Sequence, residues 1–184
     1  IIADIGNNSN ARRDLTIYYI NEPYPWETVT TSIYKKIRFY YPEQKEIPSP
    51  VKNYDAEAVF WNNHYIYILT KHRSDSNTRL YRIDPSLEEL EIPAEFLEEF
   101  NTQARVTGAD MDSTGKKIAV LTETSLWLFE RSVDSQKFFS GSVYWIPLEL
   151  KQPEAVCFDG PYIIILNETG ELYRIEQTIL HLLK

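Results

Sequence analysis

The sequence predicts an all-β fold of the β-propeller type, and three observations support this. Aromatic residues make up 14% of the 184 residues, and aromatic side chains favour the pleated, half-buried surfaces of strands. Three segments resemble one another, with Ala58, Ala109 and Ala155 at equivalent positions. Each segment reads as a short strand, a polar turn, an apolar strand, a second turn and a third strand. Repeats of roughly 40 to 50 residues with several strands each are typical of propeller blades.

The second strand of each repeat is an almost continuous apolar run, whereas a strand exposed on one face would alternate. These runs are "YIYIL" (65–69), "IAVLT" (118–122) and "YIIIL" (162–166). Burial on both faces is what an inner strand experiences between two neighbouring blades. The turns before the second and third runs contain Gly115 and Gly160, and glycine readily adopts the positive φ that tight hairpins need.

The outer strands are predicted from less regular segments. "ELEIPAEF" (89–96) and "SVYWIPLEL" (142–150) would close two of the blades, and Pro93 and Pro147 suit an edge position, where no ladder donor is needed. Two segments keep an alternative. Residues 94–100 could form a short helical turn instead, and residues 178–184 fit a strand or a helix equally well.

The N-terminal segment reads as the middle of a blade. Residues 1–20 align with residues 65–83, so we expect a second strand at 1–5, a third at 15–20 and an outer strand at 34–42. The first strand of this blade would then be absent, and the chain would be the C-terminal part of a larger propeller. A four-bladed ring is the alternative if another segment supplies that strand. The expected blades span residues 1–50, 51–104, 105–150 and 151–184.

Four motifs follow one another along the chain. They are Asp4-Ile5-Gly6-Asn7-Asn8, Asp55-Ala56-Glu57-Ala58, Val106-Thr107-Gly108-Ala109-Asp110 and Glu154-Ala155. In these motifs the sequence resembles a family of uncharacterised bacterial β-propeller proteins, and it is more distantly similar to phytase-like and esterase-like propellers. The resemblance implies a six-bladed or similar propeller. Many members carry Asp where this chain has Asn7, and this loss of a carboxylate argues against a strong metal site at that position.

Three carboxylates are candidate metal ligands. Glu57, Asp110 and Glu154 lie on or beside equivalent innermost strands, which line the central channel of a propeller. Convergent carboxylates could bind Ca²⁺, which takes six to eight oxygen ligands. They could instead raise one another's pKa and act as acid and base. In the third reading, each accepts hydrogen bonds from backbone donors at a strand end.

Two long loops supply the candidate ligand-binding residues, because long ordered loops often carry function. The predicted residues are Asp4, Asn7, Asn8, Lys71, His72 and Arg73. At a channel mouth the basic residues 71–73, with Arg12 and Arg13 at the corresponding loop, could receive an anion such as phosphate or a sugar acid. In the other reading it pairs with nearby carboxylates on a solvated loop.

Composition excludes several classes of function. The net charge of −8 argues against a nucleic-acid binder, which normally presents a basic face. No run approaches the ~18 apolar residues of a membrane span. The chain has no phosphate-cradling glycine loop and no Cys/His zinc pattern. The lone Cys157 reads as a small buried hydrophobe.

The sequence therefore favours a propeller scaffold that binds a small molecule or a protein partner at its channel face. The alternative is a Ca²⁺-dependent hydrolase of phosphoesters or esters, of the phytase-like or esterase-like kind, and a third class is a structural adhesive domain. Whether the protein is an enzyme is left open. The compartment is also open, and a removed upstream signal peptide would indicate a secreted or periplasmic protein.

Overall fold

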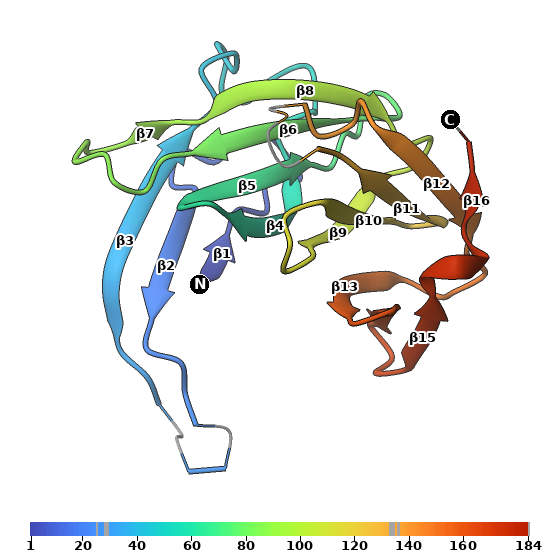
Figure 1. The fold of residues 1–184 in the computed structure, drawn as a ribbon. Coiled ribbons are helices and arrows are strands. Elements are labelled where there is room, and N and C mark those ends of the chain that lie inside the picture. The colour runs from blue at the N-terminus through green and yellow to red at the C-terminus, as the bar shows by residue number, and fades with distance from the viewer. Residues whose placement is uncertain (25, 28–29, 133–134, 136, 184) are drawn as a thin grey trace.

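The computed structural model describes residues 1–24, 26–27, 30–132, 135 and 137–183. Over these residues the protein is all-β, as predicted, with sixteen strands in four sheets and a single 3₁₀ turn. The sheets follow one another along an open arc, with the first and the last at opposite ends (Figure 1). In the described part of the chain, no helix has the length and apolar character needed to cross a bilayer.

The first sheet contains the N-terminal strands. Strands β1 (Ile2–Asp4), β2 (Thr16–Ile20) and β3 (Ile33–Tyr40) pair antiparallel in that order. These positions agree with the strands expected at residues 1–5, 15–20 and 34–42. An unexpected fourth strand, β7 (Ile92–Pro93), comes from much later in the chain and pairs parallel to β3.

The second and third sheets each contain four antiparallel strands that follow one another in the sequence. The exception is the two-residue β7, which lies between β6 and β8 in the sequence but belongs to the first sheet. The second consists of β4 (Ala56–Asn62), β5 (Tyr65–Thr70), β6 (Asn77–Ile83) and β8 (Glu95–Asn101). The third contains β9 (Val106–Met111), β10 (Lys117–Thr122), β11 (Ser125–Glu130) and β12 (Ser142–Pro147), and a fifth strand from the C-terminal segment joins it. Residues 95–101 are therefore a strand, and not the helical turn that was the alternative.

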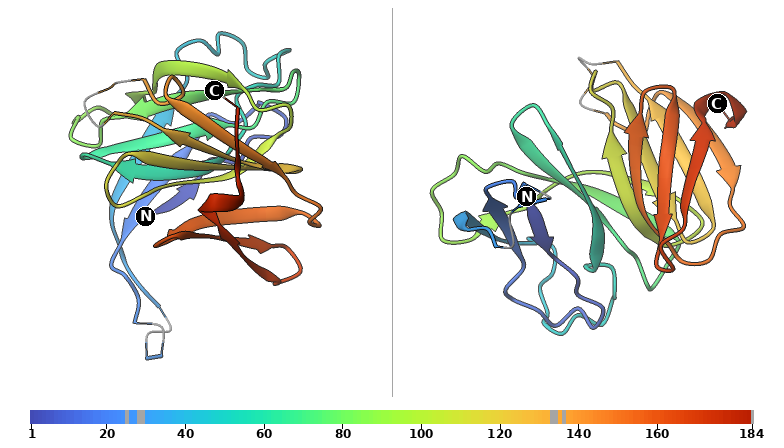
Figure 2. Two further views of the ribbon diagram at one scale, coloured as in Figure 1. Left: turned by 45° about the vertical axis from the view of Figure 1, so that its right-hand side comes forward. Right: turned by 90° about the horizontal axis from the view of Figure 1, so that it is seen from below.

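The fourth sheet is three-stranded and leads into the C-terminal segment. It contains β13 (Pro153–Asp159), β14 (Tyr162–Asn167) and β15 (Leu172–Glu176). The chain then forms the 3₁₀ turn η1 (Gln177–Ile179) and the short strand β16 (His181–Leu182), which pairs with β12 of the third sheet. The C-terminal segment thus combines both predicted alternatives. Figure 2 shows the fourth sheet packed beside the third.

Successive sheets pack face to face and enclose three hydrophobic cores. The first core lies between the first two sheets and includes Ile17, Phe39 and Tyr81. The second lies between the second and third sheets around Trp127 and Phe129, and the third lies between the third and fourth sheets. Strands β5 and β10 contribute to the cores on both of their faces, so their continuous apolar runs are explained as predicted.

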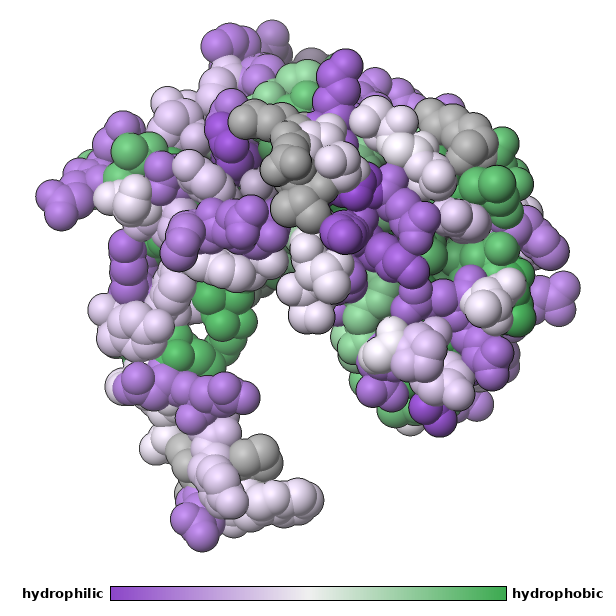
Figure 3. Space-filling model, viewed as in Figure 1, coloured by the Kyte–Doolittle hydropathy of each residue, from purple (hydrophilic) through white to green (hydrophobic). Residues whose placement is uncertain are grey.

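Two predictions about the fourth sheet were wrong for one reason. Residues 162–166 were expected to be buried on both faces, yet Leu166 is 42% exposed. Cys157 was expected in the core, yet it is exposed. One face of this sheet packs on the third sheet, while no described residue covers the other face in the same way. The open side of the arc is visible as a hollow in Figure 3.

The hairpin turns use the backbone conformations that the sequence predicted. Gly115 and Gly160 have φ of 70° and 56°, in the left-handed region where glycine avoids a steric penalty. In the turn between β4 and β5, Asn63 and His64 both have positive φ, at 44° and 70°. Two successive positive φ values are characteristic of the tight turns that match the twist of a hairpin.

Candidate functional site

Strands β4, β9 and β13, the first strands of the second, third and fourth sheets, lie side by side, with β9 between the other two. Each contains one irregularity at which a residue is skipped in the pairing with the next strand of its sheet. The skipped residues are Glu57 in β4, Thr107 in β9 and Glu154 in β13. An extra residue of this kind is a β-bulge, which redirects a side chain and is common beside binding sites. The three bulges are therefore structurally equivalent positions on neighbouring strands.

Asp110 does not share this position. It pairs opposite Ala119, farther along β9 than Thr107, and its Oδ2 accepts a hydrogen bond of 2.9 Å from the backbone N–H of Phe158. Asp110 thus links β9 to β13. Sequence reasoning missed Thr107 because it aligned Ala109 with Ala58 and Ala155, and this alignment was wrong by one residue. The residue that follows the bulge in β9 is Gly108.

Glu57 is held by a buried lysine. The Nζ of Lys71 lies 2.6 Å from Oε2 of Glu57 and 4.0 Å from Oε1 of Glu123. The Lys71 side chain is only 9% exposed, so its charge needs these carboxylates as partners. Glu123 also pairs with Arg105, at 3.5 Å.

Glu154 has no such partner. Its carboxylate makes no hydrogen bond or ion pair with any residue that the structure describes. Partial burial, followed by the charge of Glu57, raises the pKa of Glu154; Glu168 and Glu123 act in the same direction, and Lys71 opposes them. The pKa rises because water withdrawal and like charges both disfavour the ionised form. Glu154 is therefore a partly buried carboxylate at this edge that is available to a ligand.

Thr107 has an unused polar group at the equivalent bulge. Its side chain is buried, with the residue 2% exposed, and Oγ1 has no hydrogen-bond partner in the described residues. Because Gly108 brings β9 very close to the Glu154 carbonyl, Thr107 lies near the Glu154 bulge. We call Glu57, Thr107, Glu123, Glu154 and Glu168, together with Lys71, the inner-edge cluster.

The inner-edge cluster is not arranged as a metal centre. Among the described residues, no group of three or more His, Cys, Asp or Glu side chains is placed to hold a metal ion. Of the three predicted metal ligands, Glu57 and Glu154 share a position, and Asp110 lies at another level of β9.

The two long loops meet around a second buried carboxylate, that of Asp55. Oδ1 of Asp55 accepts a 2.6 Å hydrogen bond from the backbone N–H of Asn7. Oδ2 lies 2.9 Å from Nε and 2.7 Å from Nη2 of Arg73. Asp55 is fully buried, so these bonds replace the water that its charge would otherwise bind.

The amide residues complete this loop assembly. The Oδ1 of Asn7 accepts hydrogen bonds from the backbone N–H groups of Ala11 and Arg12, both at 2.9 Å. The Oδ1 of Asn8 accepts from Nη2 of Arg73 at 2.6 Å. At the end of β1, Asp4 accepts from Nη1 of Arg12 at 2.7 Å. The loops of the first and second sheets are thereby joined by side chains that were predicted to bind a ligand.

His72 lies in a separate buried pair. Its side chain is 1% exposed, and Nδ1 lies 2.6 Å from Oδ1 of Asp75. Burial lowers the pKa of His72, although Asp75 acts in the opposite direction. Because Nε2 has no hydrogen-bond partner in the described part of the chain, the neutral ring with its proton on Nδ1 fits this environment best.

The predicted ligand-binding residues thus fall into separate groups. Asn7, Asn8 and Arg73 meet at Asp55, whereas Lys71 faces Glu57, His72 faces Asp75 and Asp4 faces Arg12. All six already have partners within the protein. This arrangement corresponds to the reading in which the basic residues pair with nearby carboxylates.

No protein-family model and no curated protein matches this chain. Among solved structures, the computationally designed Ika4 protein is similar over 66% of this chain and 90% of its own, with 7% identity and a TM-score of 0.34. A likeness of this degree does not define a fold family.

Proposed function

We propose that the four sheets are consecutive propeller blades and that the protein is a scaffold binding a small molecule or a protein partner through the inner-edge cluster. Support for the blades comes from the repeated strand order, the face-to-face packing and the equivalent bulges at Glu57, Thr107 and Glu154. The second, third and fourth sheets each contribute one strand, β4, β9 and β13, to the same edge. The bulge residues Glu57 and Glu154 are at least partly exposed along this edge, whereas Thr107 between them is buried.

The unpartnered carboxylate of Glu154 carries this proposal. It lies among like charges, its pKa is raised, and the unused hydroxyl of Thr107 lies on the neighbouring strand. A positively charged group of a ligand would relieve the repulsion and would donate hydrogen bonds to the carboxylate oxygens of Glu154. The ammonium of Lys71 beside Glu57 and Glu123 is an example within the same cluster. The ligand group that fits best is therefore a primary ammonium.

Calorimetric titration with cadaverine tests the proposal, with 1-pentanol as the uncharged comparison. Wild-type protein should bind cadaverine and not pentanol. Glu154→Gln should weaken binding at least about tenfold, because a charge-assisted hydrogen bond is lost. Glu149→Gln is the matched control, since Glu149 is exposed and outside the cluster. Equal affinity in the two variants, or no binding by the wild type, would refute the proposal.

The alternative is the Ca²⁺-dependent phytase-like or esterase-like hydrolase that the sequence resemblance implies. It requires at least three carboxylates within coordination range of one ion, and among the described residues no such group is in place. Melting curves in Ca²⁺ and in EDTA separate the alternatives, because an ion bound to the native state raises the melting midpoint. A rise with Ca²⁺ that Glu154→Gln abolishes would favour the hydrolase, and the absence of a rise would count against it.

A further inference from the structure

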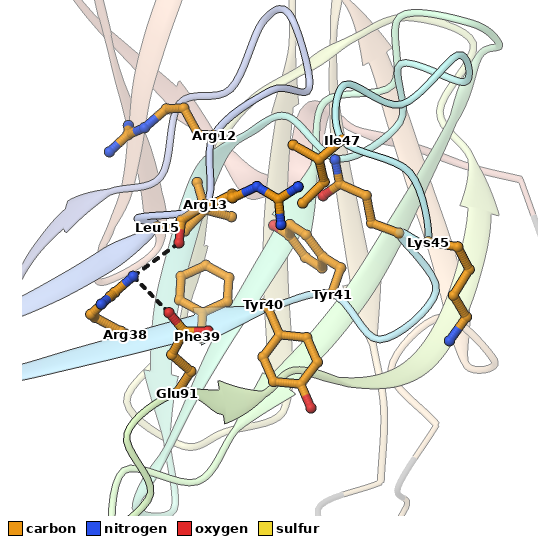
Figure 4. Close-up of a pocket in the computed structure, with 11 residues that line it drawn as sticks. Arg12, Arg13, Leu15, Arg38, Phe39, Tyr40, Tyr41, Lys45, Ile47 and Glu91 are labelled. Atoms are coloured by element: carbon orange, nitrogen blue, oxygen red, sulfur yellow. Dashed lines mark hydrogen bonds and ion pairs between the residues drawn. The ribbon is translucent and has the colours of Figure 1, made fainter.

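A cavity of about 380 Å³ opens between the loop after β1, the end of β3 and the segment 41–47. Its lining includes Arg12, Arg13, Arg38 and Lys45, against a single carboxylate, that of Glu91. Figure 4 shows these side chains, with the Arg13 side chain directed toward Tyr41 and Ile47. A basic cavity contrasts with the net charge of −8 of the whole chain, and such a local concentration of positive charge attracts anions.

Two of the four cations are engaged elsewhere. Arg12 pairs with Asp4 and Asp14, at 2.7 and 2.9 Å. Arg38 lies 2.6 Å from Glu91 and also donates to the backbone carbonyl of Arg13.

The other two cations are available. The side chains of Arg13 and Lys45 are exposed and have no hydrogen bond or ion pair with any described residue. An arginine with free N–H groups presents a planar fork that matches a carboxylate or a phosphate.

Tyr41 lines the same cavity and carries a buried hydroxyl that is an unused donor. Its residue is 2% exposed, and its hydroxyl has no hydrogen-bond partner in the described residues. Its ring is fixed by packing against Phe39, Tyr54 and Tyr81. Burial raises the pKa of Tyr41 well above its usual value, so the hydroxyl keeps its proton and can donate. A buried hydroxyl without a partner is costly, and a bound ligand oxygen would remove that cost.

The cavity also has an aromatic surface for the rest of a ligand. Tyr40 lines it and is 45% exposed. Exposed tyrosine rings beside charged groups are suited to packing against flat apolar surfaces.

We propose that this cavity binds a small organic anion, namely a phosphate or carboxylate group attached to a ring. The anionic group accepts hydrogen bonds from Arg13 and Tyr41, with Lys45 adding positive charge, and the ring packs on Tyr40. The site is formed by residues outside the inner-edge cluster, so it does not depend on the function proposed above.

Calorimetric titrations with phenyl phosphate and benzoate test the proposal, since they separate the phosphate from the carboxylate. Inorganic phosphate lacks the ring, and benzyl alcohol lacks the charge. We expect at least one ringed anion to bind more tightly than inorganic phosphate, and benzyl alcohol not to bind. Failure of both ringed anions to bind would overturn the proposal.

Variants locate the site. Arg13→Gln should weaken binding at least about tenfold, and Lys45→Gln should weaken it less. Tyr41→Phe should weaken binding without lowering the melting midpoint, which distinguishes a ligand contact from damage to the core. Lys151→Gln, an exposed lysine outside the cavity, should bind as the wild type does. Equal binding in Arg13→Gln and Lys151→Gln would show adventitious binding only and would overturn the proposal.

Discussion

Replacing Asp55 with Asn removes a buried negative charge and leaves the size of the side chain unchanged. The carboxylate accepts one hydrogen bond from the backbone of Asn7 and two contacts from the Arg73 guanidinium. Removing one partner of a buried ion pair costs about 3–5 kcal/mol. The Arg73 side chain is 23% exposed, so water partly solvates its charge once the carboxylate is gone. We therefore expect a loss of unfolding free energy near the lower end of this range, about 3 kcal/mol. For a chain of this size that lowers the melting midpoint by roughly 6–12 °C.

Urea denaturation followed by tryptophan fluorescence measures this loss. Asp159→Asn is the matched control, because Asp159 is exposed and its ion pair with Arg174 is 4.0 Å long; it should change the stability by less than about 0.5 kcal/mol. A double-mutant cycle with Arg73→Gln isolates the pairwise contribution. A loss below about 1 kcal/mol in Asp55→Asn, or additive effects in the cycle, would refute the view that Asp55 holds the two loops together.

Three further predictions concern pH, charge and packing. Burial lowers the pKa of His72 in the folded protein. As the pH falls below about 6.5, the His72 ring is therefore protonated in the unfolded chain before it is protonated in the folded protein. The free energy of unfolding should therefore be retained above that pH and fall below it. Urea midpoints measured from pH 8 to 5 should show a smaller fall for His72→Gln than for the wild type. If the two proteins lose stability in parallel, the buried neutral ring of His72 is not the cause. Glu154→Gln should slightly raise the melting midpoint at pH 7, since it removes a charge that the fold disfavours, and the gain should shrink when Glu154 becomes protonated in acid; a lower midpoint at pH 7 would show that the carboxylate has a partner. Gly141→Ala should lower the free energy of unfolding in urea by about 2–3 kcal/mol or more, because a Cβ at this position meets the Glu130 carbonyl. Gly6→Ala is the control and should be nearly neutral, because a Cβ there has open space. Similar effects in the two variants would argue against the close approach of Gly141 to Glu130.

The strands that the sequence predicted well are those with a strong local pattern. The apolar runs of β5 and β10 and the turn glycines Gly115 and Gly160 identify hairpins because periodicity and backbone conformation are local properties. The pairings of β7 and β16 could not be predicted in this way. Each has only two residues and pairs with a strand of the preceding sheet, so neither leaves a periodic signal.

The candidate sites show the same division. The two long loops were predicted to contain polar residues that act together, and Asn7, Asn8 and Arg73 do meet. Asp55, their common partner, was recognised only as part of a motif, since burial of a carboxylate cannot be read from its neighbours in sequence. The cavity beside Arg13 and Lys45 was not predicted at all, because its wall combines residues from three distant segments of the chain.

The crossing of β7 to the first sheet also constrains the order in which the protein can be completed during synthesis. The outer edge of β3 at Phe39 and Tyr40 has unpaired backbone groups until residues 92 and 93 have been made, and an unpaired edge is a template for unwanted strand addition. The edge of β12 at Tyr144 and Trp145 likewise has unpaired backbone groups until residues 181 and 182 have been made. Each of these two edges is thus covered by a segment that is synthesised only after strands of the following sheet.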